Sequence, residues 1–216
     1  KYDSPLYILD ENSLRNSCRA YKKALKEYYP GESLPIYASK ANSSVFMSYL
    51  VASEGFGLDA VSEGELLTAL EGGVPNEKII FHGNNKSDKE IEFAVKNNIK
   101  IIVDNDYDLK RLEEVSKFLD KDLEIMIRFT PGIECHTHEY IRTGSFDSKF
   151  GFGIEYLDNL FTIISNTKHL KLIGLHAHIG SQIFELDPHK DLGEIMVNTI
   201  LKAKKFGHHI KELNLG

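Results

Sequence analysis

A lysine and two histidines stand in this sequence where their side chains could do chemistry. Lys40 lies in the stretch 36–44, IYASKANSS, where an apolar run of strand character gives way to small and polar residues. His176 and His178 alternate within the stretch 172–181, LIGLHAHIGS. Alternate residues of a strand point to the same face, so both imidazoles are predicted to point the same way. Burial at the inner end of a strand would lower the pKa of the lysine amine from about 10.4 and favour its nucleophilic neutral form.

Three kinds of site fit these side chains. In a metal-dependent hydrolase, the strand histidines would bind the metal. The remaining ligands would then come from Asp104, His82, His136 and His138. Alternatively, Lys40 is an amine nucleophile that forms a Schiff base with an aldehyde cofactor such as pyridoxal phosphate. The third possibility is a binding protein without catalysis, and for Lys40 alone an ion pair with Asp59 also remains open.

Strand-like runs alternate with helix-like runs and set the positions of these residues. The predicted strands are 36–42, 57–62, 78–84, 100–105, 123–130, 170–180 and 210–216. The first five starts are 21 to 23 residues apart, which leaves room for a strand, a helix and two short loops. Such alternation predicts a parallel sheet with right-handed crossovers.

Helices are predicted between these strands from their apolar spacing and their end signals. The predicted ranges are 63–72, about 87–97, 106–119 and about 187–206. Ser87 opens the second helix with a capping-box pattern, whereas Gly72-Gly73 ends the first. Before the repeat, 6–9 is predicted as a short strand and 11–29 as one amphipathic helix. We therefore divide the chain into an N-terminal part, 1–35, and a partial barrel, 36–216.

Polar residues recur at the predicted strand ends. In a parallel α/β fold the carboxyl ends of the strands share one edge, where functional side chains gather. The residues at these ends are Lys40, Asp59, Ser62, His82, Asp104, Asn105, Arg128, His176, His178 and Ser181. Ser62 and Asn105 could equally be helix N-caps. The whole set predicts a functional pocket at this edge.

Two architectures compete for this repeat. Seven strands favour a closed (β/α)₈ barrel over an open doubly wound sheet, and no G-x-G-x-x-G follows the first strand. The sequence stops at Gly216, the end of the seventh predicted strand. We therefore expect either an open sheet or a barrel fragment with about seven of its eight strands.

Composition excludes several kinds of partner. A net charge of −6 argues against a nucleic-acid-binding surface. No apolar run approaches the roughly 20 residues that span a bilayer, so no membrane partner is expected. Cys18 and Cys135 cannot form a disulfide framework, and a cytoplasmic location is the simplest interpretation.

Six stretches, in order along the chain, resemble the fold-type III pyridoxal phosphate-dependent decarboxylases. They are YASKAN, GLDAVSEGEL, IMIRFTPG, the loop HTHEYIRTG with SKFGF, GLHAHIGSQI and the final LNLG. The resemblance covers about 5–216. It implies an α/β fold, a TIM-like barrel of the alanine racemase type, which is incomplete in this chain and lacks the C-terminal β domain.

The resemblance also implies a cofactor site at the strand ends. Lys40 would hold pyridoxal phosphate covalently and be the catalytic residue. Asp59 and Glu65 would lie near the cofactor, as would Arg128 from the fifth strand. No metal is implied, because an imidazole can pack on the cofactor ring without binding a metal ion.

The remaining implied contacts come from the last two strands. His178 would stack on the pyridine ring, whereas Ser181 and Gly216 would contact the phosphate. The implied reaction is decarboxylation of an amino acid, meso-2,6-diaminopimelate, to L-lysine and CO₂, in a homodimer with shared active sites. This chain alone is expected to be an inactive fragment. The alternatives are ornithine, lysine or arginine decarboxylation on the same scaffold, and a homologue that binds without catalysis.

Overall fold

A computed structural model describes residues 2–133 and 149–216. The helices are α1 (Glu11–Tyr28), α2 (Val45–Ser53), α3 (Glu63–Glu71), α4 (Asp88–Lys96), α5 (Asp106–Leu119), α6 (Leu157–Ser165) and α7 (Asp187–Lys205). The strands are β1 (Ile36–Ala38), β2 (Gly57–Ala60), β3 (Ile79–Phe81), β4 (Lys100–Val103), β5 (Leu123–Thr130), β6 (Phe152–Gly153), β7 (Leu170–His176) and β8 (Glu212–Asn214). No helix among these described residues is both long and apolar enough to cross a membrane.

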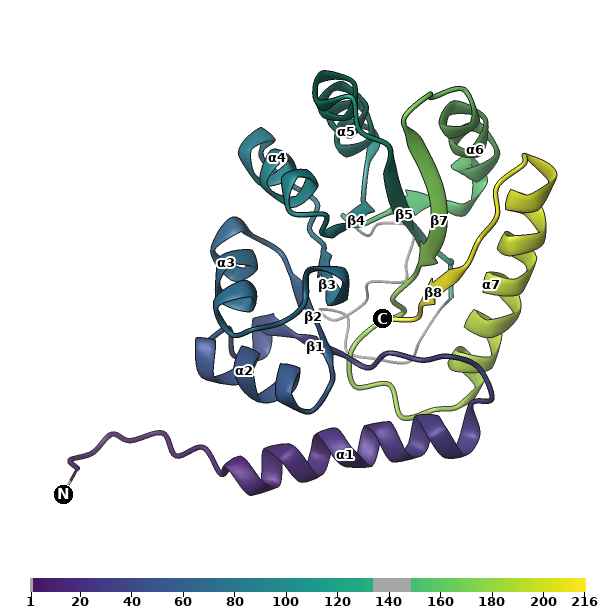
Figure 1. Cartoon of the computed structure of the whole chain (residues 1–216). Helices are drawn as coiled ribbons and strands as arrows, with labels where there is room; N and C mark the ends of the chain where they lie inside the picture. Colours follow the sequence, from purple (N-terminus) through teal and green to yellow (C-terminus); the bar gives the residue numbers. More distant parts are fainter. Residues whose placement is uncertain (1, 134–148) are drawn as a thin grey trace.

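The sheet is a parallel half-barrel. Its order is β1-β2-β3-β4-β5-β7-β8, with the short β6 paired to β5, and every pairing is parallel. Figure 1 shows the strands curving around a centre near Gly216, with α2 to α7 on the outer, convex side. The predicted α/β class and incomplete barrel are confirmed.

All seven predicted repeat strands form, although most are shorter than expected. The first ends at Ala38, and the following 39–41 form a 3₁₀ turn, so Lys40 lies just beyond the strand. The strand predicted at 6–9 is wrong: these residues are exposed and pair with no strand in the described part of the chain. An isolated extended segment has no ladder hydrogen bonds to hold it as a strand.

Helix α1 was predicted correctly and attaches to the repeat through one carboxylate. Arg15 and Arg19 each place a guanidinium nitrogen 2.9 Å from Glu54 Oε1, just after α2. Lys22 Nζ donates to the Glu54 carbonyl oxygen at 2.8 Å. Three cations therefore meet the carbonyl end of α2, where the helix dipole also favours positive charge.

The concave face of the sheet carries a small apolar layer. Ile80, Ile102 and Met126 are buried together there, with Ile36 packed against them. Their neighbours along each strand, such as Phe81 and Ile101, belong to the larger core between sheet and helices. Because strand side chains alternate between faces, the next inward-facing positions lie two residues further along.

Gly174 makes room for this apolar layer. It pairs with Met126 across β5 and β7, and an added Cβ would lie 2.6 Å from Met126 Cγ. Cβ atoms do not approach other carbons this closely, so a side chain at this position would push Met126 aside.

We therefore expect Gly174→Ala to destabilise the protein by about 1–3 kcal/mol through overpacking. Urea denaturation followed by circular dichroism measures this loss. Gly193→Ala is the matched control, because nothing lies within 4 Å of its added Cβ and the residue sits inside α7. Ala is the better helix former, so that control should be neutral or stabilising by up to about 1 kcal/mol. Equal stability of Gly174→Ala and the wild type would contradict the packing argument.

Candidate functional site

A polar row lies directly above the apolar layer on the concave face. Each member follows an inward-facing apolar or glycine position by two residues. The row consists of His82, Asp104, Arg128 and His176. The register pairs Arg128 with His176, and His176 with Asn214, so the parallel ladder itself keeps these side chains level.

His82 lies between a carboxylate and a second histidine. Its Nε2 atom is 3.1 Å from Asp59 Oδ1 of β2. Both atoms are buried, yet the approach is not aligned as a hydrogen bond, and neither atom has another partner in the described part of the chain. The rings of His82 and His176 meet edge to face, with centroids 4.8 Å apart. Side chains from β3 and β7 thus meet across the interior of the half-barrel.

His176 is a neutral histidine with a defined tautomer. Burial lowers its pKa well below the ordinary 6.5, and the neighbouring His82 and Arg128 lower it further. Its Nδ1 lies 3.2 Å from the carbonyl oxygen of Asn214. A carbonyl can only accept, so Nδ1 carries the proton of the neutral ring.

His178 lies beside the predicted lysine. Burial lowers its pKa to about 4, with further lowering by the positive charges of Arg128 and Lys40. Asp59 acts in the opposite direction on the same ring. Four sequence-predicted site residues, Lys40, Asp59, Arg128 and His178, therefore lie near one another. The lowered pKa leaves the His178 imidazole uncharged at neutral pH.

The predicted burial of Lys40 is wrong for this chain. Its side chain is exposed, whereas Ser39 beside it is buried. The reason is topological: Lys40 follows β1, which pairs only with β2 among the described strands. No further strand covers that edge in the described residues, so solvent reaches the amine.

Asp104 connects Gly151 to the sheet. Its Oδ2 accepts the N–H of Gly151 at 3.2 Å, and Arg128 Nη1 lies 3.8 Å from its Oδ1. The guanidinium of Arg128 also stacks over the Phe150 ring, 4.4 Å from its centroid. Burial raises the pKa of Asp104 and lowers that of Arg128. The predicted barrel arginine therefore lies within the polar row.

A buried ion pair contacts the backbone of the polar row at Asp104. The sequence analysis did not predict this pair. Lys86 Nζ lies 2.6 Å from Asp108 Oδ2, and both side chains are fully buried. The same carboxylate accepts the backbone N–H of Asp104 at 3.0 Å. Lys86 follows the strand-end histidine by four residues and just precedes the capping box of α4, a position that could have drawn attention to it.

The other predicted site residues lie in loops or caps. Glu65 Oε2 accepts the backbone N–H of Val61 at 2.7 Å, and Ser62 caps the same helix, α3. Ser181 is exposed after β7. Gly216 follows β8 with φ +87°, and its N–H donates to Asn214 Oδ1 at 3.0 Å. Since β7 and β8 are neighbours, Ser181 and Gly216 belong to adjacent loops at one edge of the sheet.

Part of the predicted site falls outside the described residues. His136 and His138, with the whole HTHEYIRTG stretch, lie in the range 134–148 that the structure does not describe. Among the residues that it does describe, no three His, Cys, Asp or Glu side chains are grouped to hold a metal ion.

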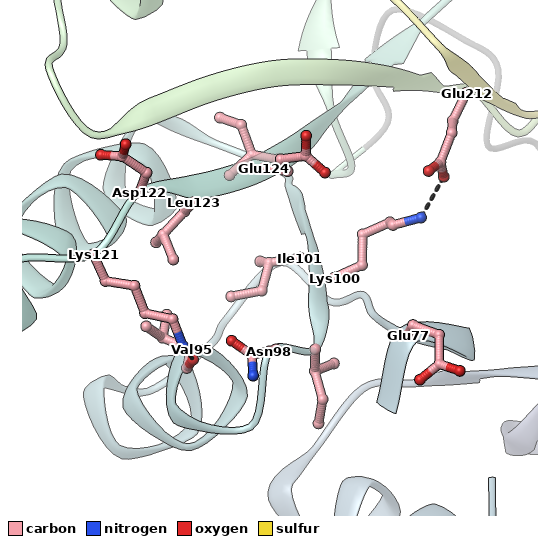
Figure 2. Close-up of a pocket in the computed structure, with 12 residues that line it drawn as sticks. Glu77, Val95, Asn98, Lys100, Ile101, Lys121, Asp122, Leu123, Glu124 and Glu212 are labelled. Atoms are coloured by element: carbon pink, nitrogen blue, oxygen red, sulfur yellow. Dashed lines mark hydrogen bonds and ion pairs between the residues drawn. The ribbon is translucent and has the colours of Figure 1, made fainter. Parts of the chain in front are cut away.

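A cavity of about 450 Å³ lies at the opposite, amino ends of the strands. Figure 2 shows Lys100 paired there with Glu212, and Lys121 beside Val95, whose carbonyl oxygen accepts from Lys121 Nζ at 2.7 Å. Its lysines are thus already engaged. The polar row, with its unpartnered buried atoms, is the better candidate for chemistry.

A curved parallel sheet with converging polar side chains at its carboxyl edge defines a ligand-binding domain of the (β/α)-barrel class. Residues 11–216 match the sequence profile of the pyridoxal-dependent decarboxylases, in the part described as their pyridoxal binding domain. The chain belongs to this family, which confirms the predicted cofactor, pyridoxal phosphate.

Relatives of this chain carry a more specific name. It is 48% identical over 224 residues to diaminopimelate decarboxylase of Synechocystis sp., covering 100% of this chain and 48% of the relative. The crystal structure of Helicobacter pylori diaminopimelate decarboxylase complexed with L-lysine is similar with TM-score 0.90 and 31% identity, over 98% of this chain and 53% of that one. Diaminopimelate decarboxylase from M. jannaschii gives TM-score 0.91 and 30% identity, over 100% and 51%. The chain thus spans about half the length of these relatives.

The residues at the strand ends fit this cofactor. An uncharged imidazole, His178, offers a flat face, and the backbone of the glycine after β8 lies close against this ring. An added Cβ on Gly216 would lie 2.3 Å from His178 Nδ1. Buried polar atoms without an aligned partner belong to Asp59 of β2, to His82 directly after β3 and to Asp104 directly after β4. A cofactor with polar substituents suits such a lining.

We expect acidification to destabilise the protein through His176. The lowered pKa means that the folded state holds fewer protons than the unfolded chain. The associated stability is therefore complete above about pH 6.5 and is lost as the pH falls below it, at up to about 1.4 kcal/mol per pH unit. His176→Asn should reduce this slope by about one proton, measured by urea unfolding between pH 7.5 and pH 5.

His189→Asn is the matched control, because His189 is exposed on α7 and should not affect the slope. A slope in His176→Asn equal to that of the wild type would show that another group causes the acid sensitivity.

Proposed function

We propose that this chain is the cofactor-binding half of an enzyme that decarboxylates meso-2,6-diaminopimelate to L-lysine and CO₂. One observation carries the proposal: Lys40, Asp59 and Arg128 all lie close enough to act on the pKa of His178, at the carboxyl edge of a half-barrel of the pyridoxal-binding family. The substrate rests on the relatives that carry the name diaminopimelate decarboxylase, one of which is 48% identical and one of which is described in complex with L-lysine.

Lys40 is the residue assigned to hold the cofactor. Its Nζ is an amine at the carboxyl edge of the sheet, and its exposure leaves it accessible to an aldehyde. The negative charge of Asp59 raises the pKa of the nearby His178. The same charge would favour a protonated nitrogen at Lys40. When bound, pyridoxal phosphate supplies an electron sink for the bond that breaks to the substrate carboxylate.

His178 is assigned to pack against the pyridine ring. Its pKa of about 4 leaves the imidazole neutral at physiological pH, so its face can lie on an aromatic ring without the cost of burying a cation. Two aromatic faces in contact also exclude water from one side of the reacting centre.

The remaining assigned contacts hold the charged ends of the ligands. Arg128 offers a planar guanidinium fixed by Asp104 and Phe150, which suits an anionic oxygen. Ser181 and Gly216 offer a hydroxyl and a backbone turn on adjacent loops for the phosphate. Glu65 is assigned a place near the cofactor, although one of its oxygens caps α3.

The wider setting completes the proposal. We assign 1–35 as a lead-in segment and 36–216 as the cofactor-binding barrel part, in a cytoplasmic homodimer whose active sites are shared. A decarboxylase for ornithine, lysine or arginine on the same scaffold is the alternative. Assay of the full-length protein against diaminopimelate and these three amino acids distinguishes them by substrate preference.

Lys40→Ala in the full-length protein should abolish both decarboxylation and the visible absorbance of the lysine-bound cofactor, because no other amine is assigned to hold it. The measurements are CO₂ release and the visible absorbance of the bound cofactor. Lys110→Ala removes an exposed lysine from α5 and should preserve both signals. Full activity in Lys40→Ala would refute the assignment.

His178→Ala should weaken cofactor affinity by up to about tenfold, the value of one aromatic contact. Titration of cofactor-free protein with pyridoxal phosphate, followed by fluorescence, measures the dissociation constant. His178→Phe keeps an aromatic face and should retain most of the affinity. Unchanged affinity in the alanine variant would mean that the ring packs elsewhere.

A further inference from the structure

Three side chains from distant parts of the sequence, Asp59, His82 and His176, contact one another in series inside the candidate site. Asp59 of β2 lies 3.1 Å from His82 Nε2, and the His82 ring meets His176 of β7 at 4.8 Å between centroids. His176 is in turn held by the carbonyl oxygen of Asn214 in β8. This series of contacts therefore connects β2, near one side of the half-barrel, with β7 and β8 at the other.

The hydrogen-bond acceptors beside His176 and His82 determine which ring nitrogen of each histidine carries the proton. The Asn214 carbonyl requires the proton of His176 on Nδ1. Asp59 can only accept when ionised, so the tautomer of His82 that stabilises it carries its proton on Nε2. Oδ1 of Asp59 has no hydrogen-bond partner in the described part of the chain, and His82 Nε2 lies 3.1 Å from it. A protonated Nε2 at this distance favours the charged form of the carboxylate.

We propose that His82 is a positioning residue that keeps Asp59 ionised near the amine of Lys40, with His176 holding the His82 ring in place. This inference rests on the proposed function, in which Lys40 holds the cofactor. It gives His82 a role through Asp59 and not through contact with the cofactor.

The physical argument concerns the charge of a half-buried carboxylate. A carboxylate that loses its N–H donor in such surroundings becomes easier to protonate. Lys40 follows by two residues Ala38, the residue paired with Asp59 in the register of β1 and β2. The other charged and titratable groups of this part of the site are Asp104 after β4, Arg128 of β5, His176 of β7 and His178 after it. Among all these groups, the amine of Lys40 is the one whose protonation the visible spectrum of the bound cofactor reports. Loss of negative charge on Asp59 makes a protonated nitrogen at Lys40 less favourable.

His82→Leu in the full-length holoenzyme tests the proposal without an activity assay. The measurement is the pH midpoint of the visible absorbance change of the bound cofactor. We expect the midpoint to fall by about one pH unit or more, the size of a lost neighbouring opposite charge. His82→Gln retains an amide N–H near the position of Nε2 and should restore most of the wild-type midpoint.

A double-mutant comparison excludes a merely structural effect. Asp59→Asn should lower the midpoint by itself, and His82→Leu added to it should produce no further shift, because its effect passes through the carboxylate. Melting temperatures of all variants are measured beside the spectra. Equal shifts in His82→Leu and His82→Gln, no shift in either, or additive shifts in the double variant would overturn the inference. If the wild type shows no visible cofactor band that depends on Lys40, the proposed function itself fails.

If His82→Leu does not fold, the comparison between Asp59→Asn and His82→Gln decides. The amide variant should then stay within about 0.3 pH units of the wild type while Asp59→Asn moves by about one unit or more. A shift of His82→Gln as large as that of Asp59→Asn would contradict donation through an N–H group.

Discussion

In-register parallel pairing is the constraint on which the rest of this structure depends. It aligns Met126 with Gly174 and then Arg128 with His176, so one row of side chains is apolar and the next is polar. The inward sides of β3, β4 and β5 follow this order, whereas β2 and β8 place Asp59 and Glu212 at the level of the apolar layer. An apolar layer thus closes the interior, and the polar groups above it have no direction in which to extend except toward the carboxyl edge.

Several buried groups in and around the polar row are either paired or uncharged, whereas Asp59 Oδ1 and Asp104 Oδ1 have no hydrogen-bond partner in the described part of the chain. Lys86 and Asp108 neutralise each other where both are fully buried. His176 and His178 lie where burial suppresses their protonation. Buried charge without a partner would cost several kcal/mol, whereas a neutral imidazole costs far less. The site therefore has an apolar layer beneath it and a small number of charged side chains, Asp59, Asp104 and Arg128. Their backbone positions are set by the register of the sheet.

The two ends of the half-barrel differ in chemical character for the same reason. At the amino ends, Lys100 and Glu212 complete an ion pair on the inner face, and Lys121 donates to a carbonyl oxygen (Figure 2). At the carboxyl ends, Asp59 and His82 approach closely without an aligned hydrogen bond. A satisfied end adds stability, whereas groups left partly unsatisfied remain available to a ligand.

The sequence by itself determined the features that depend on neighbouring residues. Strand spacing predicted the parallel α/β sheet, Ser87 predicted the start of α4 through its capping box, and the strand-end positions predicted that His82 and His176 face one edge. The tertiary structure decided which of these groups meet. It brought His82 against His176 from strands far apart in the sequence, paired Lys86 with Asp108, and left Lys40 exposed beside an edge strand. The reason is physical: caps and alternation arise from bonds within a few residues, but burial and pairing arise from the curvature of the whole sheet.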